Sequence, residues 1–149
     1  GNDRDVTCWV NLSGVDNATL NRAWHELANN GTTVVNLTAY VTSSSTTGAT
    51  ADFNATEVLC GVNNCPNQNS HANVSIKAAN NESNSCTQGL QSTFAGLLNP
   101  ASQLNTTLCQ RFEFADANDE INTYFYLKIP DDADQGARGF TVTYYATAK

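Results

Sequence analysis

Methionine is absent from the 149 residues, and lysine and arginine together number seven against fourteen aspartates and glutamates. A nucleic-acid-binding protein displaces counterions from phosphates with a basic surface, so a formal net charge of −7 excludes nucleic acid as a partner. No run of about 18 apolar residues occurs, so we expect no membrane span. Only two histidines are present, and neither a Gly-x-Ser-x-Gly motif nor a phosphate-binding glycine loop accompanies them. The sequence therefore predicts neither an enzyme nor a cofactor.

Polar uncharged side chains take the place of the missing charges. Charged residues make up 14%, below the ~25% of typical domains, whereas asparagine, threonine and serine number 20, 18 and 10. Eight asparagines begin an Asn-x-Ser/Thr sequon, where 28 serines and threonines in 149 positions predict about four by chance. The enrichment favours an extracellular, cell-surface protein with covalent N-glycans as a candidate modification. The candidate glycosylation sites are Asn11, Asn17, Asn30, Asn36, Asn54, Asn73, Asn81 and Asn105.

The five cysteines are typical of an oxidising compartment, and the missing methionine leads us to expect that an export signal has been removed. Cys60 and Cys65 are close enough in sequence to close a small ring. Cys86 and Cys109 flank a predicted helix and are candidates for fastening it to a sheet. This pairing is one of fifteen arrangements that leave one cysteine out. Our candidate for the unpaired thiol is Cys8, which lies on the apolar face of a predicted strand.

Alternation of apolar and polar residues, the pattern of a half-buried strand, dominates the chain. Six segments show it clearly, and residues 53–59 are a weaker candidate. Such a pattern predicts an all-β fold, a β-sandwich of jelly-roll or immunoglobulin-like type. The expected inward residues are Val6, Cys8, Val10 and Leu12; Val35, Leu37, Ala39 and Val41; Val74, Ile76 and Ala78; Phe112 and Phe114; Phe125, Leu127 and Ile129; and Phe140, Val142 and Tyr144.

Two stretches have apolar residues at helical spacing, so we expect one or two short helices in the connections. The first runs over Asp16–Gly31 and carries Leu20, Ala23, Trp24 and Leu27. The second runs over Gly89–Pro100 and carries Leu90, Phe94, Leu97 and Leu98. Both apolar stripes are expected to face the core.

Acidic residues cluster in two turns. One turn contains Asp116, Asp119 and Glu120, and the other contains Asp131, Asp132 and Asp134. Solvated turn acids are the simpler interpretation, so no metal site is predicted. Calcium is the alternative, because closely spaced carboxylates suit a hard cation. The minor calcium candidates are Asp132 and Asp134.

Residues 1–14 contain a compact amphipathic strand, and residues 15–149 are expected to form the sandwich domain. Val6, Cys8, Val10 and Leu12 share one face of this strand, and Trp9 lies on the other. The segment is either an ordinary edge strand or a donor strand that completes the sheet of a neighbouring subunit. The sequence leaves both possibilities open.

The C-terminal stretches Tyr124-Phe-Tyr-Leu-Lys-Ile-Pro130 and Gly139-Phe-Thr-Val-Thr-Tyr-Tyr-Ala-Thr147 flank an acidic, glycine-containing loop. Together they resemble the closing hairpin of prokaryotic surface β-sandwich proteins, among them pilus and filament subunits that assemble by donor-strand complementation. The resemblance implies a jelly-roll or immunoglobulin-like subunit whose N-terminal strand docks into a groove of its neighbour, in a purely structural role. The five cysteines and the first predicted helix depart from that pattern.

We therefore expect a structural subunit of an extracellular filament, a helical homopolymer whose partners are copies of the same chain. The expected interface residues of the donor strand are Val6, Cys8, Trp9, Val10 and Leu12. The alternative is a secreted carbohydrate-binding or adhesin domain, and a viral coat jelly roll is a third interpretation. Aromatic platforms for the carbohydrate-binding alternative would come from Trp9, Trp24, Tyr40, Tyr124, Tyr126 and Tyr145.

Overall fold

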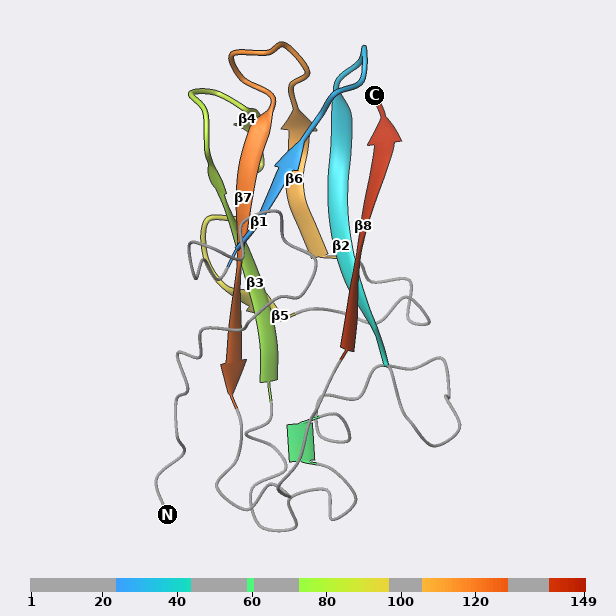
Figure 1. The fold of residues 1–149 in the computed structure, drawn as a ribbon, viewed down its shortest axis with the longest axis vertical. Helices are drawn as coiled ribbons and strands as arrows, with labels where there is room; N and C mark the ends of the chain where they lie inside the picture. Colours follow the sequence, from blue (N-terminus) through green and yellow to red (C-terminus); the bar gives the residue numbers. More distant parts are fainter. Residues whose placement is uncertain (1–23, 44–58, 61–72, 97–105, 129–139) are drawn as a thin grey trace, which may run out of the picture.

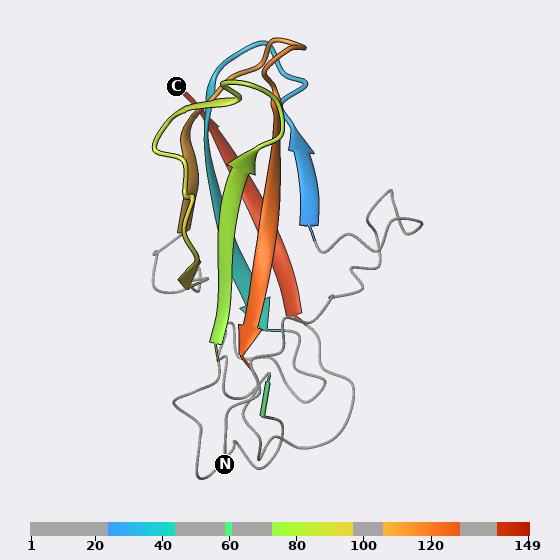
Figure 2. The ribbon, with the colours of Figure 1, turned by 90° about the vertical axis from the view of Figure 1, so that its left-hand side faces the viewer.

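The computed structural model describes residues 24–43, 59–60, 73–96, 106–128 and 140–149, which form a β-sandwich of two four-stranded antiparallel sheets (Figures 1 and 2). The first, here called the β1 sheet, has the order β1 (Trp24–Ala28), β7 (Glu120–Lys128), β3 (Asn73–Asn80) and β5 (Ala95–Gly96). The second, the β8 sheet, has the order β4 (Cys86–Gln88), β6 (Thr106–Phe112), β2 (Val35–Ser43) and β8 (Phe140–Ala148). The predicted all-β sandwich is confirmed.

The core lies between the sheets and follows the period-two pattern where the strands are regular. On β2 and β3 every second residue contributes an apolar side chain to the core, because successive side chains of a strand point to opposite faces; Thr38 and Ser75 between them are buried polar residues. Val142 and Tyr144 of β8 and Phe125 of β7 are partly buried and pack against this cluster. The buried apolar residues of these two strands are Leu37, Ala39 and Val41 on β2, and Val74, Ile76 and Ala78 on β3.

Strand β6 departs from strict alternation, and the prediction for it was partly wrong. Leu108 and Cys109 are adjacent and both fully buried, and the register between β2 and β6 shifts at this point. Such a bulge turns two consecutive side chains toward the core. Phe112 is buried as expected, but Phe114 lies beyond the end of the strand and is 39% exposed.

The first predicted helix is wrong over the part of it that the structure describes. Residues 24–28 form strand β1, and residues 16–23 lie outside the described ranges. Trp24 pairs with Tyr124 of β7, with ring centroids 5.7 Å apart. Leu27 packs against the core from the opposite face of the strand. Cross-strand pairing and burial on two faces outweigh the helical spacing of the apolar residues.

The second predicted helix is also wrong over residues 89–96. Gly89 has a φ of 65°, and a Cβ at this position would lie 2.5 Å from Gln110 Cγ. The following backbone bridges the two sheets, because Gln91 accepts from the Ala78 amide and donates to the Leu108 carbonyl. Residues 97–100 of this prediction lie outside the described residues.

Three connections carry the chain between the sheets at one end of the sandwich: residues 29–34, 81–85 and 113–119 (Figures 1 and 2). The Asn29 amide donates to the carbonyls of Thr33, Phe112 and Glu113. The Asn29 backbone amide donates to the Asp119 carbonyl. These bonds satisfy backbone groups that no sheet ladder reaches.

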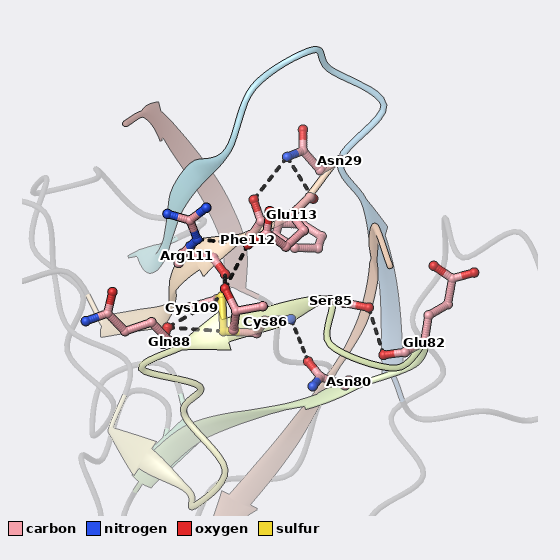
Figure 3. Close-up of a disulfide and its surroundings, with 11 residues drawn as sticks. Asn29, Asn80, Glu82, Ser85, Cys86, Gln88, Cys109, Arg111, Phe112 and Glu113 are labelled. Carbon is pink, nitrogen blue, oxygen red and sulfur yellow. Dashed lines mark hydrogen bonds and ion pairs between the residues drawn. A yellow bond between two sulfur atoms is a disulfide. The ribbon is translucent and has the colours of Figure 1, made fainter. Parts of the chain in front are cut away.

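A disulfide between Cys86 and Cys109 fastens the three-residue edge strand β4 to β6 (Figure 3). The predicted pairing of these two cysteines is confirmed, although the segment between them contains no helix in its described part. Cys60 is buried and disulfide-bonded as well. Its partner lies outside the described residues, so its predicted bond to Cys65 stays a prediction, as does the unpaired state of Cys8.

We expect the double variant Cys86→Ala/Cys109→Ala to lose roughly 3 kcal/mol of unfolding free energy, because the bond closes a loop with a sequence separation of 23. Equilibrium urea denaturation measures the loss. Gln88→Ala, an exposed change on the same strand, is the matched control and should stay within about 0.5 kcal/mol of the unmodified chain. A double variant as stable as that control would show that β4 is held by its ladder alone.

Candidate functional site

Strand β8 forms the outer edge of its sheet and pairs with β2 along all nine of its residues (Figure 1). The Lys149 amide donates to the Val34 carbonyl, which continues the same register. In an antiparallel ladder the hydrogen-bonded residues alternate. The odd-numbered residues of β8 therefore direct their backbone groups toward β2, and the even-numbered residues direct theirs away from it.

Beyond Phe140, the first residue of β8, four even-numbered residues present backbone N–H and C=O groups at an open edge: Val142, Tyr144, Ala146 and Ala148. No hydrogen bond to these outward groups is present in the described part of the chain. Unpaired edge groups are a template for pairing with another strand, and many proteins blunt such edges with lysine, proline or bulges. The segment Phe140–Ala148 contains neither a charged residue nor a proline.

The other described edge strands are short or carry a charge. Strands β4 and β5 have three and two residues. Strand β1 has five, including the exposed Glu26, and pairs only with residues Glu120–Tyr124 of β7. Among the described strands, β8 thus offers the longest uncharged edge.

A buried polar network fixes β8 to the opposite sheet. The Tyr144 hydroxyl lies 2.6 Å from His25 Nδ1 and 2.8 Å from Thr123 Oγ1. Burial raises the pKa of the Tyr144 phenol, partly offset by the Thr123 hydrogen bond. Burial lowers the pKa of His25. Both groups are therefore neutral at pH 7, and the network joins the sheets without burying a charge.

Aromatic side chains gather on the outer face of the β1 sheet. The rings of Trp24 and Tyr124 are 5.7 Å apart, and those of Phe94 and Tyr126 are also 5.7 Å apart. Lys77 Nζ lies 4.9 Å from the Phe94 ring centroid and 5.4 Å from that of Tyr124, which links the two pairs by cation–π contacts. Phe94 is 46% exposed.

The fold separates the predicted aromatic residues into two groups. Trp24, Tyr124 and Tyr126 lie together, whereas Tyr40 and Tyr145 belong to the β8 sheet. Sequence reasoning missed Phe94, because the helical interpretation of its segment placed it in the core. Trp9 lies outside the described residues, together with the other donor-strand residues Val6, Cys8, Val10 and Leu12.

The described sequons differ in accessibility. Asn30 is exposed in the turn after β1, whereas the carboxamide oxygen of Asn36 is buried without a hydrogen-bond partner. Asn81 is exposed, but its amide donates to Glu120 and Glu26. Asn73 begins β3. Outside the described ranges lie Asn11, Asn17, Asn54 and Asn105.

The fold adds Glu82, from the 81–85 connection, to two of the acids that cluster in sequence. Carboxylate oxygens of Glu82, Asp119 and Glu120 lie within 4.8 Å of one another. Asp116 is exposed and is not part of this group. The minor calcium candidates Asp132 and Asp134 lie outside the described residues.

No family model, curated protein or solved structure matches this chain significantly. Within the described ranges, no helix has the length and hydrophobicity needed to cross a membrane.

We expect Tyr144→Phe to lower the free energy of unfolding by about 1–3 kcal/mol, because it removes the hydrogen bonds of the hydroxyl to Thr123 and to the partly buried His25 Nδ1. Tyr145→Phe is the matched control, since its side chain is 56% exposed and the same atom is removed; it should change stability by less than about 0.5 kcal/mol. Urea denaturation of both variants measures the difference. Equal losses in the two variants would contradict a role for the network in holding β8.

Proposed function

We propose that this chain is a secreted structural subunit of an extracellular filament, and that strand exchange at the open edge of β8 joins its copies. The N-terminal segment of one copy, with Val6, Cys8, Val10 and Leu12 on one face, pairs with β8 of the next. The observation that carries the proposal is the uncharged, proline-free edge of β8, on which the outward backbone groups of Val142, Tyr144, Ala146 and Ala148 have no partner among the described residues.

The chemistry of the edge suits a strand as its ligand. Val142, Tyr144, Ala146 and Ala148 together offer four amide donors and four carbonyl acceptors. A ladder hydrogen bond contributes about 0.5–1.5 kcal/mol, so several in a row hold an added strand firmly. Backbone pairing gives affinity, and alternate side chains of the added strand give specificity.

The N-terminal segment of the chain has the residue pattern expected of the added strand. Residues 6–12 alternate apolar and polar side chains in the way an edge-docking strand requires. The Cys86–Cys109 disulfide and the bonded state of Cys60 are compatible with an oxidising, extracellular environment. The eight sequons support the same location, and Asn30 is their best-exposed described member with a free side chain.

The acceptor edge is tested by Ala146→Pro. Proline removes the outward amide at this position but leaves the ladder to β2 intact, because Ala146 does not donate to β2. We expect the variant to fold and remain monomeric in analytical ultracentrifugation and negative-stain microscopy. Ala146→Val, which keeps the amide, is the matched control and should assemble.

The donor is tested by deleting residues 1–13, which should leave monomers that fail to polymerise. Filaments from the truncated chain would exclude this segment as donor, and filaments from Ala146→Pro would exclude β8 as acceptor. If the full-length chain stays monomeric at every concentration, the filament proposal is wrong.

A second candidate function, a carbohydrate-binding or adhesin domain, is favoured by the aromatic face of the β1 sheet. Sugar rings stack on exposed aromatic faces, and Phe94 with its neighbour Lys77 offers both an aromatic ring and a hydrogen-bond donor. For this function we expect the monomer to bind on a glycan array and Phe94→Ala to lose that binding. Tyr145→Ala, on the other sheet, is the control. Absence of binding by the unmodified monomer would eliminate this candidate.

A further inference from the structure

We propose that Glu82, Asp119 and Glu120 form a calcium site that ties two inter-sheet connections together. Glu82 lies in the connection between β3 and β4, whereas Asp119 and Glu120 lie where the connection from β6 enters β7. Their carboxylate oxygens lie within 4.8 Å of one another. The site is independent of the proposed filament function.

The burial of Asp119 distinguishes this group from an ordinary cluster of surface acids. The residue is only 7% exposed, and no donor in the described structure hydrogen-bonds to its carboxylate. Its backbone, by contrast, is satisfied: the amide donates to Glu82 Oε2 over 3.0 Å, and the carbonyl accepts from Asn29. Three carboxylates held this close together repel one another, and a bound cation would remove that repulsion.

Among the described residues, no protein cation forms an ion pair with the three acids. The only ion pair present within the described residues joins Arg111 to Glu113, at 2.9 Å. Hydrogen bonds from Thr87 and Arg111 lower the pKa of Glu113. The negative charge of this acid, which lies at the same end of the sandwich, is therefore stabilised. Figure 3 shows this contrast, with Glu113 beside Arg111 and the Glu82 side chain pointing away from the disulfide.

A neighbouring amide supplies further evidence of an incomplete polar network. Asn122 is 7% exposed, and its carbonyl oxygen has no hydrogen-bond partner. Its amide nitrogen donates to Asn81, which in turn donates to Glu120 over 2.8 Å. Asn122 is thus linked through Asn81 to Glu120, one of the three acids.

The chemistry and spacing favour calcium over magnesium. Calcium takes oxygen ligands at about 2.3–2.6 Å, so opposite ligands of one ion lie up to about 5 Å apart. Carboxylates spread over as much as 4.8 Å fit that span. Opposite ligands of magnesium, at about 2.0–2.1 Å, lie only about 4 Å apart, and its octahedral geometry is stricter.

The test is calorimetric titration of the metal-free full-length chain with calcium chloride, and separately with magnesium chloride. We expect one calcium ion per chain, with a Kd near the ~10⁻⁴–10⁻³ M of extracellular modules, and weaker magnesium binding. Asp119→Asn should raise the calcium Kd at least about tenfold. Asp116→Asn, an exposed acid in the same connection, is the matched control and should bind as the unmodified chain does.

Thermal unfolding provides a second readout that a merely structural aspartate would not produce. In EDTA, Asp119→Asn should melt at the same temperature as the unmodified chain or higher, because it relieves repulsion. In saturating calcium the order should reverse, with the unmodified chain higher by about 5 °C. If Asp119→Asn does not fold, Glu82→Gln carries the same comparison.

The proposal is overturned by any of three results: no calcium binding, calcium binding unchanged by Asp119→Asn, or a lower melting temperature of that variant in EDTA. Unchanged binding would direct attention to the acidic turn containing Asp131, Asp132 and Asp134 instead.

Discussion

Among the described strands, β8 has a neighbour, β2, on one side only, and the proposed assembly depends on how β8 is held there. Its odd-numbered residues use their backbone groups on β2, while Tyr144 reaches across the core to His25 and Thr123. The strand therefore stays in place without a neighbour on its outer edge. An open edge that needed a partner to remain folded would be a general aggregation hazard, whereas an independently anchored edge can select its partner.

The end of the sandwich where the chain crosses between the sheets differs from the β8 edge, because hydrogen bonds and a disulfide link its segments to one another. Connections 29–34, 81–85 and 113–119 lie outside the sheet ladders, so backbone bonds between and within the connections, together with side chains, satisfy their backbone groups. Asn29 bonds three carbonyls, and the Cys86 amide donates to Asn80 Oδ1. The disulfide fastens the shortest neighbouring strand. A disulfide and hydrogen bonds thus hold this end together, and the three acids at this end form no ion pair with a described residue.

The sequence predicts those features that follow from local alternation. Strands β2, β3, β7 and β8 are regular, half-buried strands, so a period of two finds them and identifies their inward faces. The same rule fails at β6, because the bulge at Leu108 and Cys109 places adjacent apolar residues on one face. Helical spacing is a second misleading signal, at Trp24 and Leu27. Trp24 packs on Tyr124 on the outer face of the sheet, and Leu27 packs in the core.

The candidate sites needed long-range information that no local pattern contains. Asp119 and Glu120 are adjacent in sequence, but Glu82 joins them only because β3 and β7 pair side by side. Phe94 joins Tyr126 only because its segment crosses to the β1 sheet. The sequence gives the pairing of Cys86 with Cys109 as one of fifteen arrangements. Burial and strand neighbours, which the sequence does not show, decide among them.

The polar anchor at Tyr144 also explains how an edge of uniform composition can have a defined register. Along β8 the outward side chains are threonine and tyrosine, so hydrophobic contrast between the two faces is modest. A slip of one residue would place Tyr145 inward and reverse which amides face outward. Such a slip would break the two hydrogen bonds of the Tyr144 hydroxyl. Hydrogen bonds are directional, whereas the burial of apolar surface is not, so the two bonds discriminate between registers more strictly than burial does. The network therefore fixes which four residues offer their backbone at the edge, and with them the register in which an added strand can pair.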